Sequence, residues 1–69
     1  MSLTIDVERE ADGRWVAEVP ELPGVLAYGD TEAAAVSTVE ALALRVVAER
    51  LEHGEADELV SLVFTRAAG

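Results

Sequence analysis

Apolar and polar residues alternate along the first part of the chain. In the segment 2–9 every second residue is apolar and the residues between are polar: Leu3, Ile5 and Val7 against Thr4, Asp6 and Glu8. The segment 14–19 has a second set of apolar residues at alternate positions: Trp15, Ala17 and Val19. Alternation with a period of two is typical of a strand that buries one face. The pattern therefore predicts two half-buried strands.

The residues between these strands, 11–13, predict a hairpin. A two-residue loop would place the core position Val7 opposite the polar Glu18. A three-residue loop pairs apolar positions with one another: Val7 with Ala17, and Ile5 with Val19. Directly opposed residues share a face, so we predict the three-residue loop. Gly13 at its end supplies the left-handed residue that such a loop needs.

Prolines and glycines divide the segment 20–29. Pro20 and Pro23 lack amide hydrogens, so an inner strand cannot continue through them. We predict a connection that ends in a Pro-Gly turn, with Gly24 at positive φ. A short third strand follows at 25–28, and Gly29 ends it.

A long helix is predicted from Glu32 to His53. Either Asp30 or Thr31 caps its first turn, and Glu32 places a negative charge near the positive end of the helix dipole. Gly54 is a good left-handed residue to end the helix. One apolar stripe is expected to face the sheet: Ala35, Val39, Leu42 and Val46.

A second set of apolar residues lies away from that stripe: Ala41, Leu44, Ala48 and Leu51. A helix that is apolar nearly all round is buried on more than one face. One sheet covers only one of these faces. We therefore predict a homo-oligomer, dimer or tetramer, with an interface at Leu44, Ala48 and Leu51.

The segment 59–66 reads as a fourth strand, with Val60, Leu62 and Phe64 on one face. The order strand, strand, strand, helix, strand predicts an α+β domain of two layers, in which a three-stranded antiparallel meander gains a parallel fourth strand. The right-handed crossover rule packs the helix across one face of the sheet. All of 1–69 forms this single domain.

Composition narrows the function classes. The chain has 69 residues, no cysteine and one histidine, so disulfides and His- or Cys-based metal sites are not expected. A domain this small has a marginal core, which oligomerisation would enlarge. No segment reads as a membrane span or signal peptide, so we predict a cytoplasmic protein.

Charge points to a protein partner. Fourteen acidic residues against five arginines give a net charge of −9. Such a surface repels nucleic acid and attracts basic proteins, so no direct DNA or RNA binding is expected. One acidic cluster is a candidate for the partner-binding patch: Glu49, Glu52, Glu55, Asp57 and Glu58. The alternative is that these residues form a solvated helix end.

Few residues are suited to catalysis. Ser37 and His53 are too far apart on one helix to act as nucleophile and base. Asp6 and Glu40 are the candidates for a carboxylate metal site, but Asp6 is predicted to lie away from the core. Trp15 and Tyr28 are interpreted as core or interface residues. We predict a protein that is not an enzyme and binds no metal or cofactor.

The order and spacing of several short motifs resemble the HicB-like antitoxins of bacterial toxin–antitoxin systems. The matching residues run from the hairpin to the start of the helix: Gly13, Trp15, Val16, Pro20, Leu22, Pro23, Gly24, Gly29, Asp30 and Thr31. The chain departs from the family pattern at Val25, where cysteine is common.

This resemblance implies a partial ribonuclease H fold with the fourth strand beside the first. It also implies a small basic partner, an mRNA-cleaving toxin of the HicA type, which the chain binds and neutralises. Many family members carry a C-terminal DNA-binding module, and we predict none here. Two alternatives stay open: an orphan oligomeric module that binds another protein or a ligand, and a divergent nuclease that uses Asp6.

Overall fold

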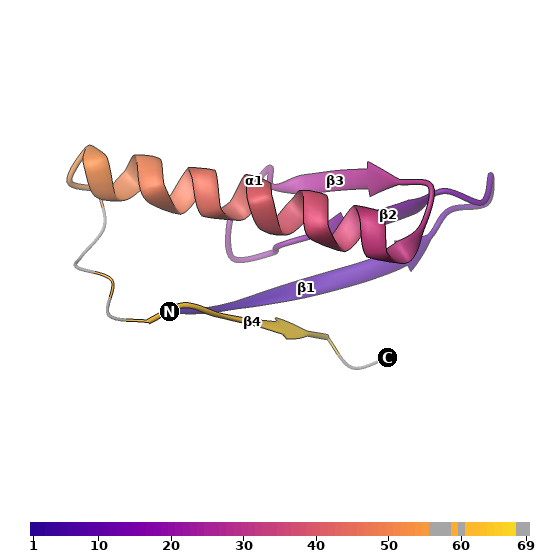
Figure 1. Ribbon diagram of the computed structural model, residues 1–69, viewed down its shortest axis with the longest axis horizontal. Helices are drawn as coiled ribbons and strands as arrows, with labels where there is room; N and C mark the ends of the chain where they lie inside the picture. The colour runs from indigo at the N-terminus through magenta and orange to yellow at the C-terminus, as the bar shows by residue number, and fades with distance from the viewer. Residues whose placement is uncertain (56–58, 60, 68–69) are drawn as a thin grey trace.

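The computed structural model describes residues 1–55, 59 and 61–67. Within these residues four strands and one helix follow one another (Figure 1): β1 Ser2–Arg9, β2 Trp15–Glu18, β3 Leu26–Gly29, α1 Glu32–Glu52 and β4 Val63–Arg66. The strands form a single sheet in the order β3-β2-β1-β4. β1–β2 and β2–β3 are antiparallel and β1–β4 is parallel. This is the two-layer α+β arrangement that the sequence predicts, with α1 across one face of the sheet.

The first hairpin has the predicted register. Val7 lies opposite Ala17. The amide of Glu10 donates to the carbonyl of Arg14, which leaves three residues in the loop, and Gly13 has a φ of 91°. The predicted pairing of Ile5 with Val19 is not formed, because β2 ends at Glu18. The amide of Val19 instead donates to the carbonyl of Val25, where the chain turns toward β3.

The connection 20–25 inserts an apolar side chain into the core. The amide of Leu22 donates to the carbonyl of Val19, and the amide of Val25 donates to the carbonyl of Leu22. Two successive turns thus point Leu22 inward, where only 3% of its surface is exposed. Gly24 has the expected positive φ, at 86°.

Helix α1 begins and ends as its sequence predicts. Thr31, rather than Asp30, is the N-cap, and its hydroxyl accepts a hydrogen bond from the amide of Ala34. His53 is the C-cap and Gly54 follows at positive φ. The cap geometry therefore satisfies backbone groups that a helix leaves unpaired at its ends.

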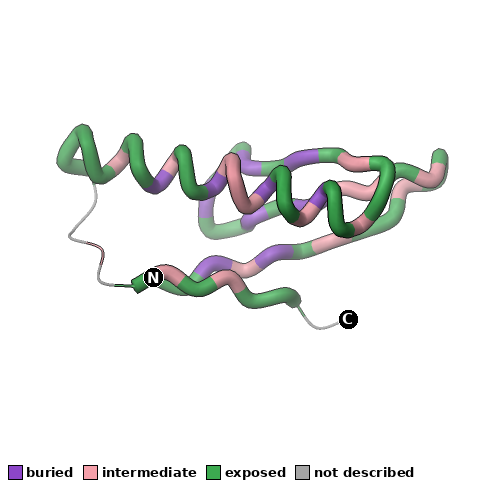
Figure 2. The backbone as a smooth tube through the Cα atoms, in the orientation of Figure 1, coloured by how far each residue is buried: buried purple, intermediate pink, exposed green. Residues whose placement is uncertain are grey.

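The buried row of α1 differs from the predicted stripe in its second half. Ala35 and Val39 are buried as expected, but the row continues through Ala43 and Val47 (Figure 2). Leu42 and Val46 are half-buried beside it. Side chains spaced four residues apart form one of the two kinds of ridge through which a helix packs against its neighbours. The small side chain of Ala43 lets the helix lie close to the sheet, so Leu42 and Val46 flank the contact.

The fourth strand is shorter than the predicted 59–66. It pairs with the start of β1, so that Leu3 lies opposite Phe64. Leu62 and Phe64 are half-buried against the core, while Val60 lies outside the described residues. At the far end of β4, Arg66 forms an ion pair with Glu32 of α1.

Glu21 ties the 20–25 connection to β1. Its carboxylate accepts hydrogen bonds from the hydroxyl of Thr4 (2.7 Å) and from the amide of Thr4 (3.0 and 3.1 Å). These bonds, the hydroxyl's first, hold the pKa of Glu21 below its ordinary value. A carboxyl whose pKa falls on folding stabilises the fold above its unfolded pKa. That contribution is lost as the pH falls through the folded pKa.

The substitution Thr4→Val is expected to raise the pKa of Glu21 toward its ordinary value. The acid-sensitive part of the stability then becomes smaller, because the folded and unfolded pKa values approach each other. An NMR titration of the Glu21 carboxyl, with urea denaturation at neutral and acidic pH, measures both effects. Thr65→Val is the matched control, since Thr65 lies opposite Thr4 on β4. Equal titration of Glu21 in both variants contradicts the proposed contact.

Candidate partner-binding surface

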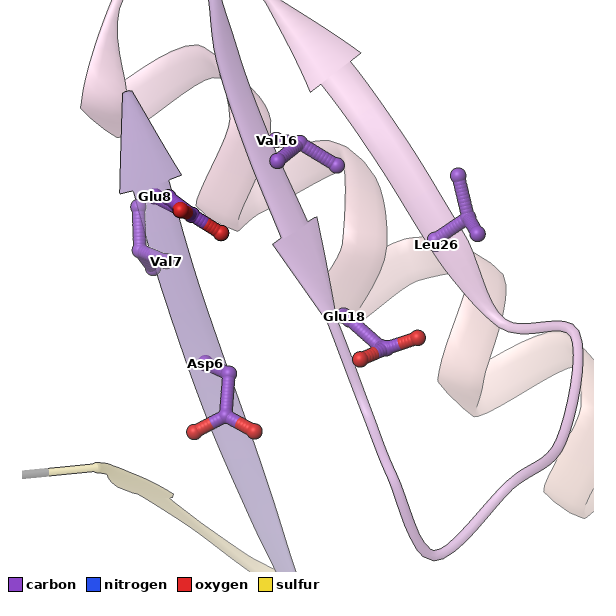
Figure 3. Close-up of a pocket in the computed structure, with 6 residues that line it drawn as sticks. All are labelled: Asp6, Val7, Glu8, Val16, Glu18 and Leu26. Atoms are coloured by element: carbon purple, nitrogen blue, oxygen red, sulfur yellow. The ribbon is translucent and has the colours of Figure 1, made fainter. Parts of the chain in front are cut away.

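The outer face of the sheet carries an open groove. Helix α1 lies behind the sheet in the view of Figure 3, and it is the single helix among the described residues, so none of these residues covers the outer face with a helix. The groove has a volume of about 470 Å³, and six residues of β1, β2 and β3 line it: Asp6, Val7, Glu8, Val16, Glu18 and Leu26. Three carboxylates and the aliphatic side chains of Val16 and Leu26 therefore share the outer face, while Val7 packs against the core at the edge of the groove.

The hairpin register places two of these acidic residues at opposed backbone positions. Asp6 lies directly opposite Glu18, and Glu8 lies opposite Val16. Like charges at opposed positions of neighbouring strands destabilise a sheet by up to about 1 kcal/mol. The opposition of Asp6 and Glu18 therefore places like charges on neighbouring strands of the groove.

The same face exposes large apolar side chains. Leu26 is 41% exposed and Tyr28 is 48% exposed, and both point away from the core. The Arg14 guanidinium lies over the Tyr28 ring, 4.9 Å from its centroid. The sequence predicts that Tyr28 is a core or interface residue, and the structure excludes it from the core. Exposed apolar groups beside charges are typical of a protein-binding surface.

The arginines do not neutralise the groove. Arg14 pairs with Asp12 at 2.9 Å, and Arg66 pairs with Glu32. Arg9 lies over the half-buried Trp15 at 5.9 Å. Arg45 and Arg50 belong to α1, behind the sheet. Among the residues that the structure describes, no ion pair involves a carboxylate of the groove.

The acidic cluster predicted from the sequence occupies a different place. Glu49, Glu52 and Glu55 are exposed at the C-terminal end of α1 and just beyond it. Asp57 and Glu58 lie outside the described residues. The acidic residues of the groove could also have been predicted from the sequence. The predicted hairpin register already implies that Asp6 and Glu18 are opposed, whereas the acids of the helix end form a cluster that is visible directly in the sequence.

The residues of the HicB-like motif mostly have local structural roles. Leu22 is buried, Gly13 and Gly24 adopt positive φ, and Thr31 caps the helix. Gly29 lies where the end of β3 touches the start of α1: a Cβ there would be 2.5 Å from the Ala35 nitrogen. Trp15 is half-buried, and three other motif residues are exposed: Pro20, Pro23 and Asp30.

The catalytic candidates are not brought together. The Ser37 hydroxyl donates to the carbonyl of Ala33 within the helix, while His53 is the helix C-cap. Asp6 lies in the outer groove, whereas Glu40 belongs to the helix on the other side of the sheet. Within the described part of the chain, no group of three His, Cys, Asp or Glu residues could hold a metal ion.

Comparison with known proteins adds no identification. No family model, no curated protein and no solved structure matches this chain. The likeness to HicB-like antitoxins therefore rests on the motif residues and remains a prediction. Over the residues described, no helix has both the length and the apolar character needed to cross a membrane.

Proposed function

We propose that this chain is a protein-binding module of the HicB-like antitoxin type, acting in the bacterial cytoplasm without catalysis of its own. Its partner is a small basic mRNA-cleaving toxin of the HicA type, and the outer groove of the sheet is the surface that holds it. The observation that supports this most is the opposition of Asp6 and Glu18 in an uncovered groove. A cation that binds between them removes the repulsion that the free fold carries.

The composition of the groove suits a protein better than a lone cation. A basic protein brings Arg or Lys to the three carboxylates and apolar side chains to the half-buried Val16 and the exposed Leu26. Apolar burial contributes affinity, while the charges steer association and select the partner. The net charge of −9 also attracts a basic protein before it contacts the groove. This attraction reaches over about one Debye length, which is about 8 Å at physiological salt.

Neutralisation follows from competition for the same cations. An enzyme that cleaves mRNA uses Lys and Arg to hold the phosphates of its substrate. A carboxylate-lined groove that takes up those side chains blocks the RNA both by charge and by bulk. The protein needs no reactive group of its own to inhibit the toxin in this way.

Binding to the purified HicA-type toxin of the same host tests the proposal. We expect a complex whose affinity falls as salt is raised, and mRNA cleavage that stops when chain and toxin are equimolar. The double variant Glu49→Lys, Glu52→Lys tests the rival patch at the helix end. It should slow association through the altered net charge and leave the dissociation rate unchanged.

A toxin that stays active and unbound contradicts the proposed partner. Tight binding of a different basic protein in the groove then supports the orphan-module alternative. Faster dissociation in the helix-end variant would move the binding surface to the end of α1.

A further inference from the structure

The outer side of α1 carries a second apolar surface, independent of the groove. Steps of three and four residues connect six positions along this side, which we name the helix seam: Ala34, Ser37, Ala41, Leu44, Ala48 and Leu51. The buried row occupies the opposite side of the helix, at Ala35, Val39, Ala43 and Val47. Alternating steps of three and four keep a stripe in register along two paired helices.

Leu44 and Leu51 are the large apolar side chains of the helix seam, and both are exposed to solvent. Leu44 is 48% exposed and Leu51 is 36% exposed. The other members are alanine or serine, and the Ser37 hydroxyl already donates to the carbonyl of Ala33. Ser37 can therefore be covered without leaving its hydroxyl unpaired. Small side chains between the leucines let a second helix approach closely.

The sequence of the seam is complementary to itself. If a second copy of α1 runs antiparallel about a two-fold axis near Val46, Leu44 meets the second copy's Ala48, and Leu51 meets the second copy's Ala41. Every leucine of the contact then lies against an alanine. Because each large side chain faces a small one, the two helices stay at an even distance along the contact. A parallel pair would instead stack leucine on leucine and alanine on alanine, which leaves gaps beside the alanines.

Charge favours the same orientation. Glu49, Glu52 and Glu55 gather at the C-terminal end of α1, against Arg50 alone. Parallel helices would bring two such ends together, whereas antiparallel helices separate them. Each acidic end then lies level with the middle of the other helix, away from the acidic end of that helix.

We propose that two copies of this chain associate through the helix seam as an antiparallel, two-fold symmetric dimer. The predicted interface residues Leu44, Ala48 and Leu51 lie on this seam, and the register adds Ala41, while Ala34 and Ser37 lie beyond the paired positions. A symmetric interface uses the same patch on both copies, which a self-complementary stripe provides. Because the outer groove lies on the other face of the sheet, the dimer leaves both grooves uncovered and is bivalent.

Sedimentation velocity of the purified chain, over a wide range of concentration, tests the dimer. The substitution Leu44→Gln should raise the dissociation constant of the dimer by about a hundredfold, because one apolar side chain is lost from each of two copies. Leu26→Gln is the matched control, since Leu26 is 41% exposed on the opposite side of the molecule. It should leave the dimer unchanged. Circular dichroism checks that both variants stay folded.

Single cysteines test the orientation, since the chain has no cysteine of its own. A mixture of Ala41→Cys and Leu51→Cys copies should form a mixed disulfide on oxidation, and neither variant alone should cross-link efficiently. A wild-type chain that stays monomeric at the highest concentration overturns the proposal. A dimer that Leu44→Gln does not weaken, or self-linking of each single variant in place of mixed linking, also overturns it.

Discussion

Gly29→Ala is expected to destabilise the chain by about 3 kcal/mol, enough to unfold much of a domain of this size. A Cβ at this position would lie 2.5 Å from the Ala35 nitrogen and 3.0 Å from the Ala34 carbonyl carbon. Both atoms are helix backbone, held in place by the Thr31 cap. The clash therefore cannot be relieved by a rotamer change, and β3 must separate from the start of α1. Urea denaturation measures the free energy of unfolding.

Gly24→Ala is the matched control for this loss. Gly24 has a φ of 86°, but no atom lies within 4 Å of a Cβ built there. Alanine at this position carries only backbone strain, which costs about 1 kcal/mol. If Gly29→Ala is no more destabilising than Gly24→Ala, the close approach of strand and helix is wrong.

Asp6→Lys is expected to weaken toxin binding about a hundredfold while making the free chain more stable. The lysine would oppose Glu18 with an attraction where the native pair has a repulsion, worth about 1 kcal/mol across neighbouring strands. The same lysine would meet the cations of the partner, and like charges placed together at an interface cost about 3 kcal/mol. Calorimetric titration and urea denaturation measure the two effects separately.

Glu49→Lys controls for the change in total charge, because it alters the net charge of the chain by the same amount at the helix end. It should affect stability and affinity far less than Asp6→Lys. A stability gain without a loss of affinity would show that the opposed carboxylates are unrelated to binding. Equal losses of affinity in both variants would show that only net charge matters.

The fold is predictable because each element carries its own local signal. The alternation in β1, the glycine at the end of the first hairpin loop and the cap at Thr31 each depend on a few neighbouring residues. The buried row of α1 depends on how closely the whole helix approaches the sheet, which the small Ala43 decides. Periodicity alone therefore assigned Leu42 and Val46 to the buried row, although they flank it.

The candidate surface was harder to predict than the fold. Asp6 and Glu18 are twelve positions apart in sequence, and they form one site only when the hairpin register is combined with the uncovered outer face. The acids at the end of α1, by contrast, are neighbours in the sequence and form a cluster without knowledge of the fold. Glycine at position 29 reads as a strand end in the sequence, and its contact with Ala35 becomes visible only in three dimensions.

NMR mapping of the toxin complex tests the binding surface most directly. Backbone amide shifts of the labelled chain are followed while unlabelled HicA-type toxin is added. The largest changes are expected along the groove, at Asp6, Glu8, Val16, Glu18 and Leu26. Changes confined to the end of α1, at Glu49, Glu52 and Glu55, would contradict a binding site on the outer face of the sheet.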